Sequence, residues 1–117
     1  MSQTDAQYTK VIANCKEIYS KKTKDYGTSW RILRPSSLTD QLFIKAQRIR
    51  TIQETGENRV GETVEGEFMA IVNYCIMAII QLRETELKET DLDEEQANLL
   101  YDKYAQEACS LMERKNH

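Results

Sequence analysis

The chain has 117 residues, the usual size of one domain, and 40% of them are hydrophobic, which is enough to build a single core. A net charge of −3 argues against a broad nucleic-acid-binding face, which needs a basic surface, but not against a small phosphate site. Only four glycines and one proline interrupt the chain, so the composition favours long helices over strands.

The cellular compartment is predicted from the N-terminal residues, the longest apolar run and the cysteines. Polar residues at the N-terminus do not resemble a signal peptide, and the apolar run 68–82 is too short to span a bilayer. Cys15, Cys75 and Cys109 are far apart and form no CxxC pair, so we expect reduced thiols in the core. The sequence therefore predicts a cytoplasmic protein that does not enter a membrane.

The first two helices are predicted from apolar residues at three- and four-residue steps. The first begins at Thr4, with Gln7 completing a capping box, and ends at or close to Gly27. Residues 25–35 are predicted to form a loop, because Pro35 disfavours helix at the residue before it. Ser36 or Ser37 is the expected N-cap of the second helix, which should bury Leu38, Leu42, Ile49 and Ile52 and turn at 55–58.

The third helix is predicted to begin near Glu62 and to run to about residue 82. From Phe68 onward it is apolar on nearly every side, which suits the centre of a bundle or a dimer interface. After an acidic linker, a fourth helix should start near Asp91 or Asp93 and carry the apolar residues Leu99, Leu100, Tyr104, Ala108, Leu111 and Met112. We expect an all-α, four-helix bundle-like domain over residues 1–117, with the third helix at its centre.

The fourth helix resembles the first. A shift of 93 positions aligns Tyr8 with Tyr101, and it also aligns Lys10 with Lys103 and Lys22 with Lys115. Two amphipathic helices resemble each other easily, so chance is one explanation. The other is a tandem repeat, with a first copy over about 1–85 and the start of a second over 91–117.

A first candidate site is the block Lys24, Asp25, Tyr26, Gly27 and Trp30. Gly27 allows the backbone to turn, so that amides with Thr28 and Ser29 can hold an anion, while Tyr26 or Trp30 can stack on a base. The simpler reading is a helix C-terminus whose Trp30 fills the core, and the residues alone favour that reading.

A second candidate is the pair Lys45 and Arg48, whose i, i+3 spacing directs both cations to one phosphate. Cations in the middle of a helix are more often a solvated face, but these two interrupt an apolar stretch.

A third candidate is Glu62 with Glu65, which lie on neighbouring edges of one helical stripe and are possible ligands of Mg²⁺. Asn73 falls within about 20° of Glu62 on the helical wheel. Acids in a first helical turn also stabilise the helix dipole, which explains Glu62 and Glu65 without a metal. It does not explain Asn73 or Gln81, each of which needs a hydrogen-bond partner, structural or ligand.

Three blocks of the chain together resemble a bacterial and phage family, the nucleotide-modification-associated domain of the first type. They are Lys24 to Gly27 with Ser29-Trp30, Ser36 to Gln41 leading to Lys45 and Arg48, and Glu67-Phe68 leading to Asn73-Tyr74. Bacteroidetes-like members look like tandem duplications. Phage members carry further acids where this chain has Gly66 and Ala70, which puts a transferred metal site in doubt.

The resemblance implies a nucleotide-binding helical domain, with Mg²⁺-dependent phosphate chemistry by analogy with the all-α nucleotide pyrophosphohydrolases. In that reading Glu62 and Glu65 hold the cation, Lys45 and Arg48 neutralise phosphate, and Asp25, Tyr26 and Trp30 frame a nucleotide or nucleotide-like molecule. The alternative is a non-catalytic scaffold, in which Lys45, Arg48 and Glu62 form a structural ion network. In either case we expect a homo-oligomer or packing against a second repeat.

Overall fold

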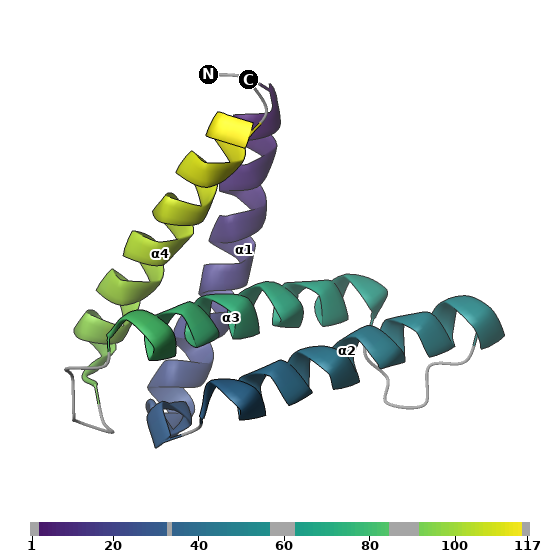
Figure 1. The fold of residues 1–117 in the computed structure, drawn as a ribbon, viewed down its shortest axis with the longest axis horizontal. Coiled ribbons are helices and arrows are strands. Elements are labelled where there is room, and N and C mark those ends of the chain that lie inside the picture. Colours follow the sequence, from purple (N-terminus) through teal and green to yellow (C-terminus); the bar gives the residue numbers. More distant parts are fainter. Residues whose placement is uncertain (1–2, 33, 57–62, 85–91, 116–117) are drawn as a thin grey trace.

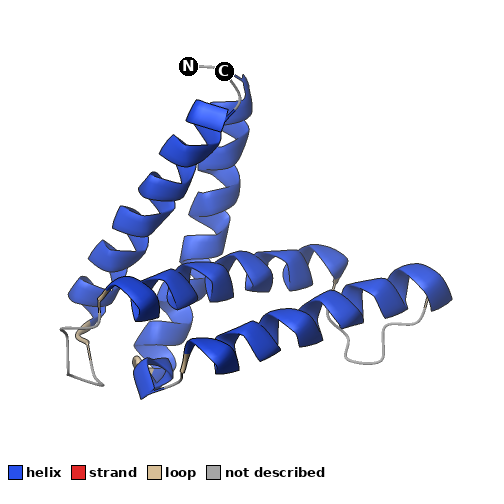
Figure 2. Cartoon of the chain, in the orientation of Figure 1, coloured by secondary structure: helices blue, strands red, loops and turns tan. Residues whose placement is uncertain are grey.

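The computed structural model describes residues 3–32, 34–56, 63–84 and 92–115. These ranges form no strand, and their helices are α1 (Gln3–Tyr26), η1 (Ser29–Ile32, a 3₁₀ turn), α2 (Pro35–Thr55), α3 (Val64–Arg83) and α4 (Glu94–Lys115). Helices α1 and α4 lie side by side with opposite directions, and the α2–α3 hairpin crosses this pair near the C-terminal end of α1 (Figure 1). The described chain is almost entirely helical (Figure 2), which confirms the predicted all-α class.

The first helix begins earlier than predicted and ends where predicted. Thr4 lies inside α1, so the capping box expected from Thr4 and Gln7 is wrong. Gly27 has a positive φ of 72°, and its N–H donates to the carbonyl oxygen of Thr23 at 2.8 Å. This is the left-handed helix ending that glycine adopts without strain.

Pro35 is the first residue of α2, and neither Ser36 nor Ser37 caps it. The predicted cap is wrong because proline needs no N–H partner in a first turn and its fixed φ suits that position. Leu38 and Ile49 are buried as expected, and Gly56, with a φ of 71°, ends the helix. Residues 57–58 of the predicted turn lie outside the described residues.

Helix α3 begins at Val64, and the Thr63 hydroxyl caps it by accepting a 2.9 Å hydrogen bond from the N–H of Gly66. It packs against all three other helices, so its central position is confirmed. It is not covered on every side, because Phe68 is 51% exposed and Leu82 is 63% exposed, and the alternative of a dimer interface on that side stays a prediction. Three neighbouring helices do not surround a fourth completely.

By length and composition alone, α3 would also be able to cross a membrane. Core helices of soluble proteins meet the same criteria. Two polar side chains interrupt its apolar surface, and both Asn73 and Gln81 are hydrogen-bonded to neighbouring elements.

Helix α4 starts after Asp93, whose carboxylate accepts a 2.7 Å hydrogen bond from the N–H of Gln96. Of the apolar residues named from the sequence, Tyr104 is buried, whereas Leu99 and Leu111 are 61% and 49% exposed; Tyr101 is fully buried. The core combines buried residues from α1, α3, α4 and the segment before α4: Tyr19, Ile76, Ile80, Leu92, Ala97, Tyr101, Tyr104 and Ala105.

The three cysteines are free thiols, as predicted. Cys15 and Cys109 are buried, but Cys75 is exposed, so its assignment to the core is wrong. Cys75 lies on the side of α3 that no other described helix covers.

Candidate functional site

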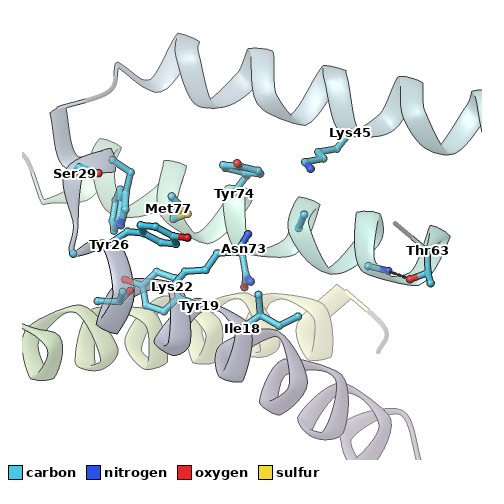
Figure 3. A pocket seen from close by; sticks show the side chains of 15 residues that line it. Ile18, Tyr19, Lys22, Tyr26, Ser29, Lys45, Thr63, Asn73, Tyr74 and Met77 are labelled. Atoms are coloured by element: carbon cyan, nitrogen blue, oxygen red, sulfur yellow. Dashed lines mark hydrogen bonds between the residues drawn. The ribbon is translucent and has the colours of Figure 1, made fainter. Parts of the chain in front are cut away.

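A cavity of about 440 Å³ opens between α1, η1, α2 and α3 (Figure 3). Its volume lies within the usual range for small-ligand sites. The described residues that line it are Ile18, Tyr19, Lys22, Thr23, Tyr26, Gly27, Ser29, Trp30, Lys45, Thr63, Gly66, Ala70, Asn73, Tyr74 and Met77.

The α1 wall of the cavity is formed by residues four apart. Ile18, Lys22 and Tyr26 follow one another at this spacing and therefore share one face of the helix. Lys22 and Tyr26 project from this face into the space beside α3 (Figure 3). Sequence reasoning missed Lys22, although its position one turn before Tyr26 is a usable signal.

The α3 wall owes its depth to small residues. Thr63, Gly66, Ala70, Asn73 and Met77 recur at steps of three and four, so they lie on one face. Gly66 and Ala70 leave room that larger side chains would fill. The spacing was readable from the sequence, but only the position of α2 shows that the space remains open.

Lys45 reaches from α2 toward α3 at one side of the cavity (Figure 3). Its ammonium lies 3.4 Å from a carboxylate oxygen of Glu67, and the Arg48 guanidinium lies 3.8 Å from the other oxygen. The Glu67 side chain is 1% exposed, whereas Lys45 and Arg48 are 13% and 38% exposed. A buried carboxylate thus holds both cations, and the ammonium of Lys45 is held beside the cavity.

Asn73 lines the cavity and also joins three helices. Its side-chain nitrogen donates to the carbonyl oxygen of Cys15 at 3.0 Å, and its oxygen accepts from the hydroxyl of Tyr101 at 2.7 Å. Burial raises the pKa of Tyr101, so its hydroxyl remains a donor at neutral pH. The partners of this buried amide are therefore structural.

The Gln81 side chain of α3 holds the short turn η1 in place through hydrogen bonds. The Gln81 side chain donates to the carbonyl oxygen of Arg31 at 2.8 Å and accepts from the Arg31 guanidinium. The ring of Trp30 lies 6.4 Å from that of Tyr19, whose pKa is raised to about 12 by burial. Trp30 is half-buried, packs on the core and lines the cavity, so the core reading is confirmed in part and the stacking reading stays a prediction.

Several predicted site residues lie outside the cavity wall. Lys24 and Asp25 are exposed in the last turn of α1, and Arg48 lies behind Lys45 in the ion network. The Thr28 hydroxyl, considered as an anion ligand, is buried and accepts from the N–H of Leu92 at 2.8 Å. It therefore ties the loop to the start of α4.

The described residues do not form a magnesium site at the cavity. Glu62 lies outside the described residues, and Glu65 lines a second hollow of about 400 Å³, beside Val11 and Phe68. Among the described residues of the cavity wall there is no carboxylate, histidine or cysteine. Because Mg²⁺ prefers oxygen ligands that include carboxylates, this donor set does not fit the ion.

The four helices and this cavity define a small all-α domain with an aromatic, cationic pocket of ligand size. The chain belongs to the family of the nucleotide modification associated domain 1, whose model matches residues 22–82 and confirms the resemblance seen in the sequence. No curated protein and no solved structure matches it significantly. All the described lining residues except Ile18 and Tyr19 fall within the matched segment, so the cavity belongs to the part that defines the family.

Proposed function

We propose that the domain binds a nucleotide or nucleotide-like small molecule in the 440 Å³ cavity. The observation that carries the proposal is the meeting of aromatic side chains with lysines in one pocket: Tyr26, Trp30 and Tyr74 with Lys22 and Lys45. Aromatic rings offer stacking surfaces to a base, and ammonium groups attract phosphate oxygens. The family's association with nucleotide modification supports the same ligand class.

Tyr26 is the residue best suited to a stacking role. It is 77% exposed although it borders the cavity, so burial in the core does not account for it. A ligand ring laid against it would cover part of this exposed surface. Truncating Tyr26 should therefore weaken binding while leaving the fold intact.

The experiment is a thermal-shift screen against nucleotides, with and without Mg²⁺. A ligand at 100 times its Kd should add roughly 2.7 kcal/mol to the free energy of unfolding. Tyr26→Ala should reduce the shift, whereas Phe43→Ala should retain it, because Phe43 is 63% exposed and does not line the cavity. The same samples, assayed for released phosphate and pyrophosphate, test whether hydrolysis follows binding.

The second candidate is a scaffold without a ligand, favoured by the network of Glu67 with Lys45 and Arg48. The sequence assigned the acidic role in this network to Glu62, which lies outside the described residues, and among the described residues Glu67 pairs with both cations. Under this reading the lysine beside the cavity serves only to fix α2 against α3. No thermal shift with any nucleotide, together with a normal fold, would favour the scaffold.

A further inference from the structure

Lys22 and Tyr26 form one continuous strip of the cavity wall. They stand four residues apart on α1, so they share one face of the helix and their Cβ atoms are about 5–6 Å apart. Both side chains project from that face into the space beside α3 (Figure 3). A flat ring laid against Tyr26 therefore has the Lys22 ammonium within one helical turn, close enough to meet a charged group that the ring carries.

The two lysines of the cavity differ in what they contact. The Lys45 ammonium lies 3.4 Å from the carboxylate of Glu67, whose side chain is 1% exposed, so this lysine is already part of the contact between α2 and α3. Drawing it toward a ligand would weaken the interactions of a buried carboxylate, which is costly. Lys22 is exposed, and none of the described residues forms a hydrogen bond or an ion pair with it. A ligand can therefore bind Lys22 without breaking an interaction within the described fold.

The part of α1 that carries Lys22 is held in place by its neighbours on the opposite side of the helix. Tyr19 is buried, and its hydroxyl donates to the carbonyl oxygen of Ala97 at 3.2 Å, which ties this part of α1 to α4. The Ser20 hydroxyl donates to the side-chain oxygen of Asn98 at 2.7 Å. The backbone of Lys22 is therefore ordered before a ligand arrives, so only its side chain loses freedom on binding.

We propose that Lys22 is the residue that selects a phosphorylated nucleotide over the same nucleoside without a phosphate. This role rests on the proposed nucleotide-binding function and assigns the phosphate contact within it to α1. The base lies against Tyr26, and the Lys22 ammonium donates a charge-assisted hydrogen bond to a phosphate oxygen. In a nucleotide one sugar separates the base from the phosphate, which suits a wall that presents an aromatic ring and an ammonium one helical turn apart.

The test is calorimetric titration of the whole chain, in a buffer with Mg²⁺, with the common nucleosides and with their mono-, di- and triphosphates. At least one phosphate should bind about tenfold more tightly than its nucleoside, the typical effect of one charge-assisted hydrogen bond. In Lys22→Met this preference should fall to about twofold or less. Lys22→Arg retains the cation and should keep most of the preference. Because Lys22 is exposed, both variants should fold normally, which thermal melts of the free chains check.

Two further variants separate the phosphate contact from charge in general and from the base. Lys21→Met removes the same charge from an exposed neighbour that does not line the cavity, so it should leave the preference unchanged. Tyr26→Ala should weaken a nucleoside and its phosphate by the same factor, because it removes only the stacking surface.

The outcomes distinguish the role of Lys22 from nucleotide binding itself. A preference for the phosphate that survives in Lys22→Met, or that is lost equally in Lys21→Met, overturns the phosphate contact at Lys22. A nucleoside that binds as tightly as its phosphates also overturns it but leaves the proposed function in place. If neither nucleosides nor their phosphates bind the unaltered chain, the proposed function itself is wrong.

Discussion

The hydroxyl of Tyr101 donates a 2.7 Å hydrogen bond to the side-chain oxygen of Asn73, at a point where α4 meets α3 under α1. Both side chains are buried, so removing one partner leaves the other poorly hydrated. The same amide reaches the backbone of Cys15 through its nitrogen, so it connects three helices. Asn73, a polar side chain in an apolar helix, therefore fixes how α1, α3 and α4 pack behind the cavity.

Tyr101→Phe should destabilise the fold by about 1–3 kcal/mol, because it leaves the Asn73 oxygen buried without its donor. Urea unfolding followed by circular dichroism measures this loss. Tyr26→Phe removes a hydroxyl from an exposed ring and should leave the free energy of unfolding nearly unchanged. Equal stability of Tyr101→Phe and the unaltered chain would show that this bond does not stabilise the junction.

In the ion network between α2 and α3, replacing a cation and replacing the carboxylate should lower stability by different amounts. Lys45→Met removes the 3.4 Å contact to the Glu67 carboxylate, whose side chain is 1% exposed, and should cost about 3 kcal/mol. Glu67→Gln should cost less, because Lys45 and Arg48 both retain access to water.

A double replacement, Lys45→Met with Glu67→Met, should recover most of the stability lost in Lys45→Met, since a buried ion pair is often replaceable by apolar side chains. Arg50→Met is the matched control, because the Arg50–Glu54 pair is exposed and should contribute less than about 1 kcal/mol. A double variant less stable than Lys45→Met would mean that the charges themselves hold α2 against α3.

The pH dependence of stability should include a contribution from Glu84. The Tyr104 hydroxyl donates to the Glu84 carboxylate at 2.6 Å and holds the pKa of that carboxyl below its ordinary value of 4.5, with Lys103 acting in the same direction. Because the pKa is lowered in the folded state, this stabilisation is complete above the unfolded value and is lost as pH falls through the folded one.

Glu84→Gln should therefore reduce stability at neutral pH and flatten its dependence on pH below about pH 4.5. Thermal melts of both chains between neutral and acidic pH measure the difference, which should shrink as the pH falls. Glu54→Gln, in an exposed pair with Arg50, serves as the comparison. A difference that stays constant with pH would contradict a lowered pKa of Glu84 in the folded state.

Local rules predicted some helix ends and not others. Gly27 ends α1 in the left-handed conformation and α4 begins after Asp93, both as expected, whereas the caps expected at Thr4 and at Ser36 or Ser37 are wrong. The sequence also marks Lys45 as a cation that interrupts an apolar stretch, and Asn73 and Gln81 as polar residues of an apolar helix that need hydrogen-bond partners, which both have. Such residues are visible without knowing what they face.

What escaped prediction depends on contacts between helices. In the sequence Glu67 is only one residue of a block that carries the family resemblance, and it is the approach of α2 that makes it the partner of Lys45 and Arg48. The sequence does not distinguish Lys22 from the other lysines of α1, because only the packing of α3 against α1 places a cavity beside it. Likewise, the apolar pattern of α4 did not identify the face that buries Tyr101, because both sides of that helix carry large side chains.

The last prediction concerns self-association, which the sequence led us to expect. On the 93-residue repeat alignment, Tyr104 and Ile18 correspond to Val11 and Leu111. Tyr104 is buried and Ile18 is partly buried, whereas their counterparts are each 49% exposed. The second hollow, beside Val11 and Phe68, adds an apolar depression on the exposed side of α3. We therefore expect two copies of the chain to meet over the surface that carries Val11, Phe68 and Leu111.

Phe68→Asp combined with Val11→Asp should convert the associated form to a monomer without lowering the melting temperature of the monomer, because both side chains are about half exposed. Light scattering coupled to size-exclusion chromatography measures the mass. Phe43→Asp places the same charge on an exposed position of α2 outside this surface and should leave the mass unchanged. We expect a second copy to cover the large exposed apolar side chains. A single monomeric species at all concentrations of the unaltered chain would contradict this expectation.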